Sequence, residues 1–154
     1  MANIDAPFGF RQVGGLGSRP TSEGTSKYII ESGFADSIFA GDIVEAGAGT
    51  SEGGTAIAAG YVGNAAATSS SRNLGIFNGC FYTDPTTAKP TFKNYWPASV
   101  AAEAQAFVYD NPDDLFEVQS EGTLVQATVA RAVDMAYTTG VTINGRSKEE
   151  ISVT

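Results

Sequence analysis

Histidine is absent from this chain, and Cys80 is its only cysteine. Without an imidazole, the chain has no group for histidine-based acid–base catalysis or for a serine triad. Zinc sites usually combine several cysteines and histidines, so we do not expect a metal site of that kind. A lone cysteine forms no internal disulfide. Because Cys80 stands among Phe77, Phe81 and Tyr82, we interpret it as a buried structural thiol.

Basic residues are also few, with nine Lys and Arg against seventeen Asp and Glu and a net charge of -8. They are scattered, whereas binding to nucleic acid requires Lys and Arg clustered on one face. We therefore expect no nucleic-acid partner. The chain has no apolar run long enough to cross a membrane. It also lacks a basic region followed by an apolar block near its N-terminus, so we expect no secretory signal.

The chain does contain many short segments of strand-forming residues, separated by turns rich in glycine, proline and asparagine. This pattern predicts a mainly β protein, arranged as a small barrel or sandwich. The predicted strands cover residues 27–30, 56–62, 74–83, 91–96, 103–109, 115–119 and 141–143. In residues 37–44, Gly41 and Asp42 stand between two apolar pairs and predict a tight turn or a bulge. Turn formation explains Asp42 more simply than a catalytic carboxylate does.

Three local patterns refine this fold. Asn78 and Gly79 allow either a two-residue hairpin or one continuous strand with a bulge at Gly79. Residues 111–114 form a turn that we expect to join 103–109 and 115–119 into a hairpin. Residues 124–136 carry apolar side chains at helical spacing and predict the one short helix of the chain.

Residues 1–23 show neither a helix nor a strand period and are interrupted by glycines and prolines. We predict an extended N-terminal arm over residues 1–23, followed by a single mainly β domain over residues 24–154. A disordered tail is the simplest interpretation of such a segment. Phe8 and Phe10 favour an arm that becomes ordered on a partner, because solvated tails seldom carry two aromatic residues so close together.

Two further patterns suggest ligand sites but are weak. Asp110, Asp113, Asp114 and Glu117 lie close in sequence, as the oxygen ligands of calcium do, but their offsets differ from those of an EF-hand loop, and a solvated turn explains them better. Glycines stand near one another as in a phosphate-binding loop, but no motif of that class is present and a surface loop is favoured. These glycines are Gly47, Gly49, Gly53 and Gly54. We assign no catalytic residue, metal or cofactor.

Several segments of the chain resemble the capsid decoration (cement) proteins of tailed bacteriophages. The resemblance depends on LGIFNGCFYTDPTTAKPTFKNYWPAS, AFVYDNPDDLFEVQ, ANIDAPFGFRQV, SIFAGDIV and TGVTINGRSKEE. It implies a tulip-like or jelly-roll-like β domain, made in the bacterial host cytoplasm, that sits as a homotrimer on the outer surface of the head of the virion. There it would hold neighbouring major capsid protein subunits together, without enzymatic activity. On this basis we expect Pro7, Phe8, Phe10 and Arg11 to contact the capsid.

Two other functions are compatible with the sequence. A carbohydrate- or cell-surface-binding β module would use aromatic faces for stacking, and Trp96, Tyr95, Tyr61 and Tyr109 are the candidates. A core or rim position explains Trp96 better. A hydrolase with two catalytic carboxylates is the third possibility, since Asp and Glu are plentiful, but no spacing marks such a pair.

Overall fold

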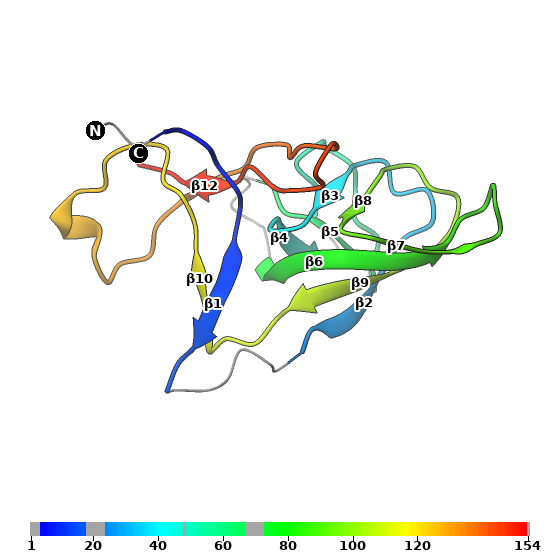
Figure 1. Ribbon diagram of the computed structural model, residues 1–154, viewed down its shortest axis with the longest axis horizontal. Helices are drawn as coiled ribbons and strands as arrows, with labels where there is room; N and C mark the ends of the chain where they lie inside the picture. Colours follow the sequence, from blue (N-terminus) through cyan, green and yellow to red (C-terminus); the bar gives the residue numbers. More distant parts are fainter. Residues whose placement is uncertain (1–3, 18–23, 48, 67–72, 154) are drawn as a thin grey trace.

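The computed structural model describes residues 4–17, 24–47, 49–66 and 73–153 (Figure 1). These residues form a mainly β fold, which confirms the predicted class. The strands are β1 Arg11–Gly15, β2 Ser26–Ile30, β3 Ile38–Phe39, β4 Ile43–Ala46, β5 Val62–Asn64, β6 Asn73–Thr83, β7 Pro90–Lys93, β8 Tyr95–Trp96, β9 Ala104–Tyr109, β10 Asp114–Glu117, β11 Met135–Ala136 and β12 Glu150–Ile151.

The largest element is a six-stranded antiparallel sheet in which β6 is central. Its strands follow the order β2-β9-β6-β4-β5, and β7 pairs with β6 beyond the end of β4. The two halves of β6 therefore have different neighbours on one edge and share β9 on the other. Strands β2 and β5, at the two ends of this order, approach each other without pairing, so the sheet is curled but is not a closed barrel. Three short ribbons, β1-β10, β3-β8 and β11-β12, complete the fold.

Strand β6 is continuous and contains a bulge, so the alternative of a hairpin at Asn78 and Gly79 is wrong. Its register against β9 shifts between Phe77 and Gly79, and Gly79 has φ 136°. Glycine tolerates this backbone conformation because it has no Cβ. The extra residue brings both Phe77 and Cys80 onto the buried face of the sheet.

The main core lies on the inner face of this sheet. It is formed by alternate residues of the strands together with side chains from the loops that cover them. Trp96 is fully buried there, and its indole N–H donates to the carbonyl oxygen of Phe34 at 3.1 Å. This confirms the interpretation of Trp96 as a core aromatic, and Cys80 is buried as predicted. The buried members of this core are Ile30, Phe34, Ile38, Val44, Ile57, Val62, Phe77, Cys80, Tyr82, Trp96, Ala104, Ala106 and Val108.

One end of the outer face of the sheet is covered. There the β1-β10 ribbon packs on Ile76 and Tyr109 through Phe10 and Phe116. The other end presents aromatic rings to solvent, in a cluster that we call the aromatic face: Phe81, Phe92 and Phe107. Phe92 stacks on Phe107 with ring centroids 5.2 Å apart and is 70% exposed.

The predicted helix over residues 124–136 is wrong. Only Gln126–Thr128 forms a single 3-10 turn, with no buried residue, and Met135–Ala136 is strand β11. Most apolar side chains at the helical spacing are exposed, including Val125 and Val129 at 62% and 65%. A helix gains most of its stability from packing its apolar face, and valines also restrict helical rotamers. Without a surface to pack against, the spacing alone does not produce a helix.

Strand pairing also differs from the prediction. Residues 103–109 and 115–119 do contain strands, but β9 pairs with β2 and β6, whereas β10 pairs with β1. The expected hairpin between them is therefore wrong. The N-terminal segment contains regular structure at Arg11–Gly15, because β10 supplies the hydrogen-bonding partner that this glycine-containing segment lacks alone. Of the strand expected at 56–62, only Val62 lies in a strand, as the first residue of β5. The strand expected at 141–143 is replaced by an isolated bridge from Val141 to Arg146.

Candidate functional site

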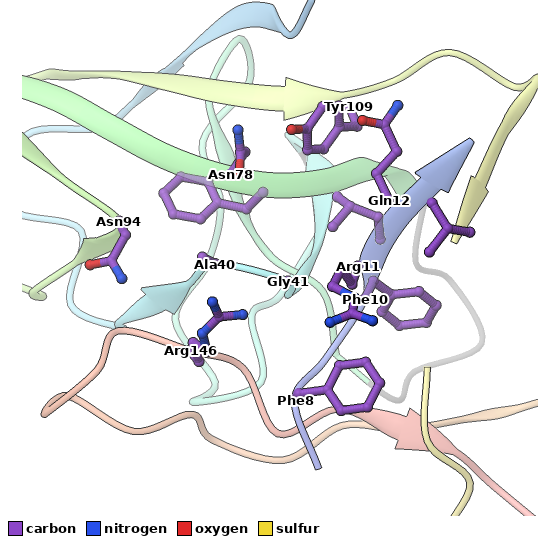
Figure 2. A pocket seen from close by; sticks show the side chains of 13 residues that line it. Phe8, Phe10, Arg11, Gln12, Ala40, Gly41, Asn78, Asn94, Tyr109 and Arg146 are labelled. Atoms are coloured by element: carbon purple, nitrogen blue, oxygen red, sulfur yellow. The ribbon is translucent and has the colours of Figure 1, made fainter. Parts of the chain in front are cut away.

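A cleft of about 630 Å³ opens between the N-terminal segment and the outer side of β6 (Figure 2). One wall comes from residues 8–13, the floor from the turn at Ala40 and Gly41 and from β6, and the far wall from Asn94 and Arg146. Six segments that are separate in the sequence therefore meet at this cleft. Its lining residues are Phe8, Phe10, Arg11, Gln12, Val13, Ala40, Gly41, Ile76, Phe77, Asn78, Asn94, Tyr109 and Arg146.

The N-terminal wall is held in place by a backbone hydrogen bond and by an ion pair within the chain. The N–H of Phe10 donates to the carbonyl oxygen of Gly41 at 3.0 Å, and the Arg11 guanidinium forms an ion pair with Glu117, its partner residue on β10. Gly9 has φ 70°, and a Cβ at that position would collide with Ser147. Glycine is therefore needed at Gly9 both for the backbone conformation and for the close approach.

The floor of the cleft is a tight turn between β3 and β4, which is one of the two alternatives, a tight turn or a bulge, that the sequence left open. Gly41 has φ 99°, and the N–H of Asp42 donates to the carbonyl oxygen of Phe39 at 2.9 Å. The Asp42 carboxylate closes the turn by accepting the N–H of Phe39 at 2.7 Å. The C-terminal segment packs beneath, because the N–H of Ser147 donates to the carbonyl oxygen of Ala40 at 3.0 Å. Asp42 thus has the structural turn role that its sequence context favours.

Two buried carboxyl groups support this floor. Asp42 is 3% exposed, and Glu149, at 1%, accepts the N–H of Ile43 at 2.9 Å. Burial raises the pKa of Asp42, because the charged form loses its hydration. Burial also raises the pKa of Glu149, and the nearby Asp42 charge raises it further. Both carboxyls bond backbone groups inside the fold, so they stabilise the floor and do not line the cleft.

The polar lining of the cleft consists of amide and guanidinium groups. Figure 2 shows Arg11 and Arg146 on opposite walls, with Asn78 on β6 and Asn94 on the same side of the cleft as Arg146. Asn94 uses its amide N–H to hold the carbonyl oxygen of Asn144 at 2.7 Å. No carboxylate is present among the described residues that line the cleft, although the chain as a whole has a net charge of -8. Such a surface favours carboxylate and carbonyl oxygens as partners.

Three of the four residues that we expected to bind a partner lie in this cleft: Phe8, Phe10 and Arg11. Pro7 precedes them and is partly buried. The sequence did not identify the opposite wall, where Asn78, Asn94 and Arg146 come from segments far apart in the chain. No local spacing marks these residues, since only strand pairing and the bridge between Ala40 and Arg146 bring them together.

The aromatic residues suggested for carbohydrate stacking do not form one platform. Trp96 is completely buried, and Tyr95 stacks on Phe39 with centroids 5.7 Å apart. The Tyr61 hydroxyl donates to Glu103 at 2.9 Å, and Tyr109 packs on the β1-β10 ribbon.

The acidic residues of 110–117 serve contacts within the fold. Asp110 accepts hydrogen bonds from the hydroxyls of Ser26 and Tyr28 at 2.8 and 2.7 Å, which ties the end of β9 to β2. Within the described ranges, no three Asp, Glu or Cys side chains are arranged to hold a metal ion.

The glycine-rich loop is packed against carboxylates of the fold. A Cβ at Gly49 would collide with the Glu45 carboxylate, and one at Gly53 would collide with that of Asp36. Negative charge at these positions repels a phosphate group. This agrees with the interpretation of residues 47–54 as a surface loop.

Comparisons of this chain with family models, with curated proteins and with solved structures gave no match. In the part of the chain that the structure describes, every helical segment is too short and too polar to cross a lipid bilayer.

Proposed function

We propose that this chain is a capsid decoration protein that binds the outer surface of a tailed-phage head and stabilises contacts between major capsid protein subunits. We infer this function from the resemblance of several segments of the chain to capsid decoration proteins. The observation that supports it best is the cleft, which combines Phe8, Phe10 and Arg11 with Arg146 in one open, carboxylate-free surface. A protruding loop of a capsid subunit that carries Asp or Glu is the partner whose charge fits this lining.

The preformed geometry of the cleft lowers the entropic cost of binding. The N-terminal wall is fixed by the Phe10–Gly41 hydrogen bond and the β1-β10 pairing, so little backbone has to be ordered when a partner enters. Binding at many equivalent positions on a shell adds these modest contacts together. An acidic protein is also suited to the outside of a shell, away from packaged DNA.

The test uses expanded heads assembled from the major capsid protein of the phage that encodes this chain. Arg146→Glu reverses the charge of one wall without touching a backbone hydrogen bond, and Phe8→Ala removes apolar contact from the other. We expect each variant to lower occupancy on heads at least tenfold at limiting concentration, measured by co-sedimentation. The matched control is Arg131→Glu, which makes the same charge change at an exposed position outside the cleft.

The outcome that contradicts the proposal is equal occupancy for the wild type, Arg146→Glu and Phe8→Ala on such heads. Failure of the wild-type protein to bind heads at all would reject the decoration function itself. A glycan array is the cheap test of the carbohydrate-binding alternative, for which the buried Trp96 offers no stacking surface.

A further inference from the structure

The aromatic face borders the cleft directly. Phe107 on β9 lies opposite Gly79 on β6, and a Cβ at Gly79 would lie 3.5 Å from the Cα of Asn94, which lines the cleft. One row across the outer side of these strands therefore has an aromatic ring at one end and a residue of the cleft at the other. Asn78, which precedes Gly79, lines the cleft as well. The polar cleft and the aromatic face are thus two parts of one continuous surface.

The rings of the aromatic face extend over β6. Strands β7 and β9 pair with opposite sides of β6, so their backbones lie about 9–10 Å apart. The ring centroids of Phe92 and Phe107, one from each of these strands, are only 5.2 Å apart, so both rings lean towards β6. Phe81, on β6 itself, adds a third ring whose centroid is 5.8 Å from that of Phe92. Together they form an apolar surface beside the polar cleft.

The cleft supplies a positive charge near this apolar surface. Among the described residues, no carboxylate forms an ion pair with the exposed guanidinium of Arg146, whereas Arg11 on the other wall is paired with Glu117. A Cβ at Gly145 would collide with the side chain of Asn94, so Arg146 follows a residue that packs directly on Asn94. An incoming carboxylate therefore meets an unpaired guanidinium on the side of the cleft that borders the aromatic face.

We propose that the cleft and the aromatic face form one groove for an extended segment of the partner, with a carboxylate bound at Arg146 and an apolar side chain on Phe92 and Phe107. This inference rests on the proposed function for the choice of the cleft as the binding site, and it defines the chemistry of the segment that binds. Phe92 and Asn94 are two residues apart, which is about 6–7 Å along an extended chain. An extended partner carries side chains on one face at the same spacing, so its acid and its apolar residue are two positions apart.

Charge and geometry select this occupant. The chain has a net charge of -8, so an acidic segment is repelled by most of its surface and is attracted at the carboxylate-free cleft. A purely apolar partner would cover the rings and leave Arg146 unpaired, and a purely acidic one would leave the rings in water. A segment with both kinds of residue satisfies both parts of the groove. A helical partner would carry the two residues three or four positions apart.

The first experiment measures peptide binding by NMR titration of the isotope-labelled full-length protein. The probe is the blocked peptide Ser-Asp-Ser-Leu-Ser, with its reversed sequence for the opposite chain direction. We expect it to shift the amide resonances of Phe92 and Asn94. Ser-Asp-Leu-Ser-Ser, which places the two side chains on opposite faces, and Ser-Asn-Ser-Leu-Ser, which lacks the charge, should each bind about tenfold more weakly. Equal binding of these peptides, or no shift at Phe92 and Asn94, overturns the proposal.

Two variants test the two contacts of the peptide separately. Arg146→Glu should abolish binding of Ser-Asp-Ser-Leu-Ser, because it replaces the positive charge with a negative one. Phe92→Ala should weaken binding about tenfold, because the apolar side chain of the peptide loses the ring that covers it. Val129→Ala is the matched control, since Val129 is 65% exposed and lies outside the groove, and it should leave binding unchanged. Wild-type affinity in either Arg146→Glu or Phe92→Ala overturns the proposal.

Occupancy on expanded heads separates this inference from the proposed function. If Arg146→Glu and Phe8→Ala lose occupancy while Phe92→Ala binds like the wild type, the cleft serves in capsid binding but the groove does not include the aromatic face, and the proposal fails. Selective peptide binding by a protein that does not bind heads would reject the decoration function and support the groove. Self-association of the wild type that Phe92→Ala abolishes would assign the aromatic face to a second copy of this chain and overturn the proposal.

Discussion

Glu149 accepts a hydrogen bond from the backbone N–H of Ile43 at 2.9 Å, although the two residues are 106 positions apart in the chain. This bond attaches the C-terminal segment to the start of β4, directly after the turn that forms the floor of the cleft. Because Asp42 is buried beside the same turn, the geometry of the cleft depends on two carboxyl groups that the cleft itself does not contain.

The first prediction concerns pH. Burial raises the pKa of Asp42 from 3.8 to about 7 and that of Glu149 from 4.5 to about 9. A carboxyl whose pKa is higher in the folded state stabilises the fold below its unfolded pKa, and this contribution is lost as the pH rises through the folded value. The free energy of unfolding should therefore be highest near pH 4 and fall between about pH 4 and pH 9. Denaturant unfolding at pH 4, 7 and 9 measures it.

Glu149→Gln provides the control for this pH dependence. The glutamine side chain keeps an acceptor for the Ile43 N–H but never becomes charged. We expect Glu149→Gln to be more stable than the wild type at pH 9, by on the order of 1–3 kcal/mol, and close to it at pH 4. Identical pH profiles for the two proteins would show that Glu149 does not titrate in this range.

The second prediction compares two glycines with similar backbone conformations. Gly9 has φ 70° and Gly17 has φ 75°, but only at Gly9 would a Cβ collide with another residue, Ser147. Gly17→Ala should cost about 1 kcal/mol, from backbone strain alone. Gly9→Ala should cost about 1–3 kcal/mol more, because the N-terminal wall must move away from Ser147. Equal costs in denaturant unfolding would contradict the close packing of the N-terminal wall on the C-terminal segment.

The third prediction concerns the thiol of Cys80. Burial raises its pKa to about 12, so at neutral pH the native protein contains almost no reactive thiolate. Labelling by a disulfide reagent should require unfolding and should accelerate with denaturant. As a control, Asn78→Cys in a Cys80→Ala background places the thiol at an exposed position of the same strand and should react immediately. Rapid labelling of native wild-type protein would contradict the buried position.

The fourth prediction separates the core from the aromatic face. Phe77→Ala, which removes a ring that is 1% exposed, should cost about 3–5 kcal/mol of unfolding free energy. Phe92→Ala removes a ring that is 70% exposed and should cost less than about 1 kcal/mol. Thermal or chemical unfolding of both variants measures the difference. A large loss of stability in Phe92→Ala would mean that the aromatic face is needed for folding and is not merely an exposed surface.

Part of this fold could be predicted because its signals are local. The strand formers in 27–30, 74–83 and 103–109 lie in strands β2, β6 and β9, since β-branched and aromatic residues fit a pleated, half-buried surface. The turn at Gly41 and Asp42 was predictable for the same reason, because its hydrogen bonds join residues that are three positions apart.

The candidate site was predictable on one wall only. Phe8 and Phe10 were recognisable as neighbouring aromatic residues that are unusual in a tail, and Arg11 was expected from the resemblance to capsid decoration proteins. Arg146 and Asn94 reach the same cleft through strand pairing over long sequence distances, which no local pattern encodes.

The sequence alone determined the class of this protein: a mainly β chain without histidine, with one unreactive cysteine and with a large excess of negative charge. Only the tertiary structure decided which strands pair, which aromatic rings are left exposed and which acids are buried. It also decided that residues 124–136 form no helix, because Leu124, Val125, Val129 and Val133 are left exposed and Met135 and Ala136 pair with β12. The physical reason is that composition and local propensity act within a few residues, whereas burial depends on what the rest of the chain places against each side chain.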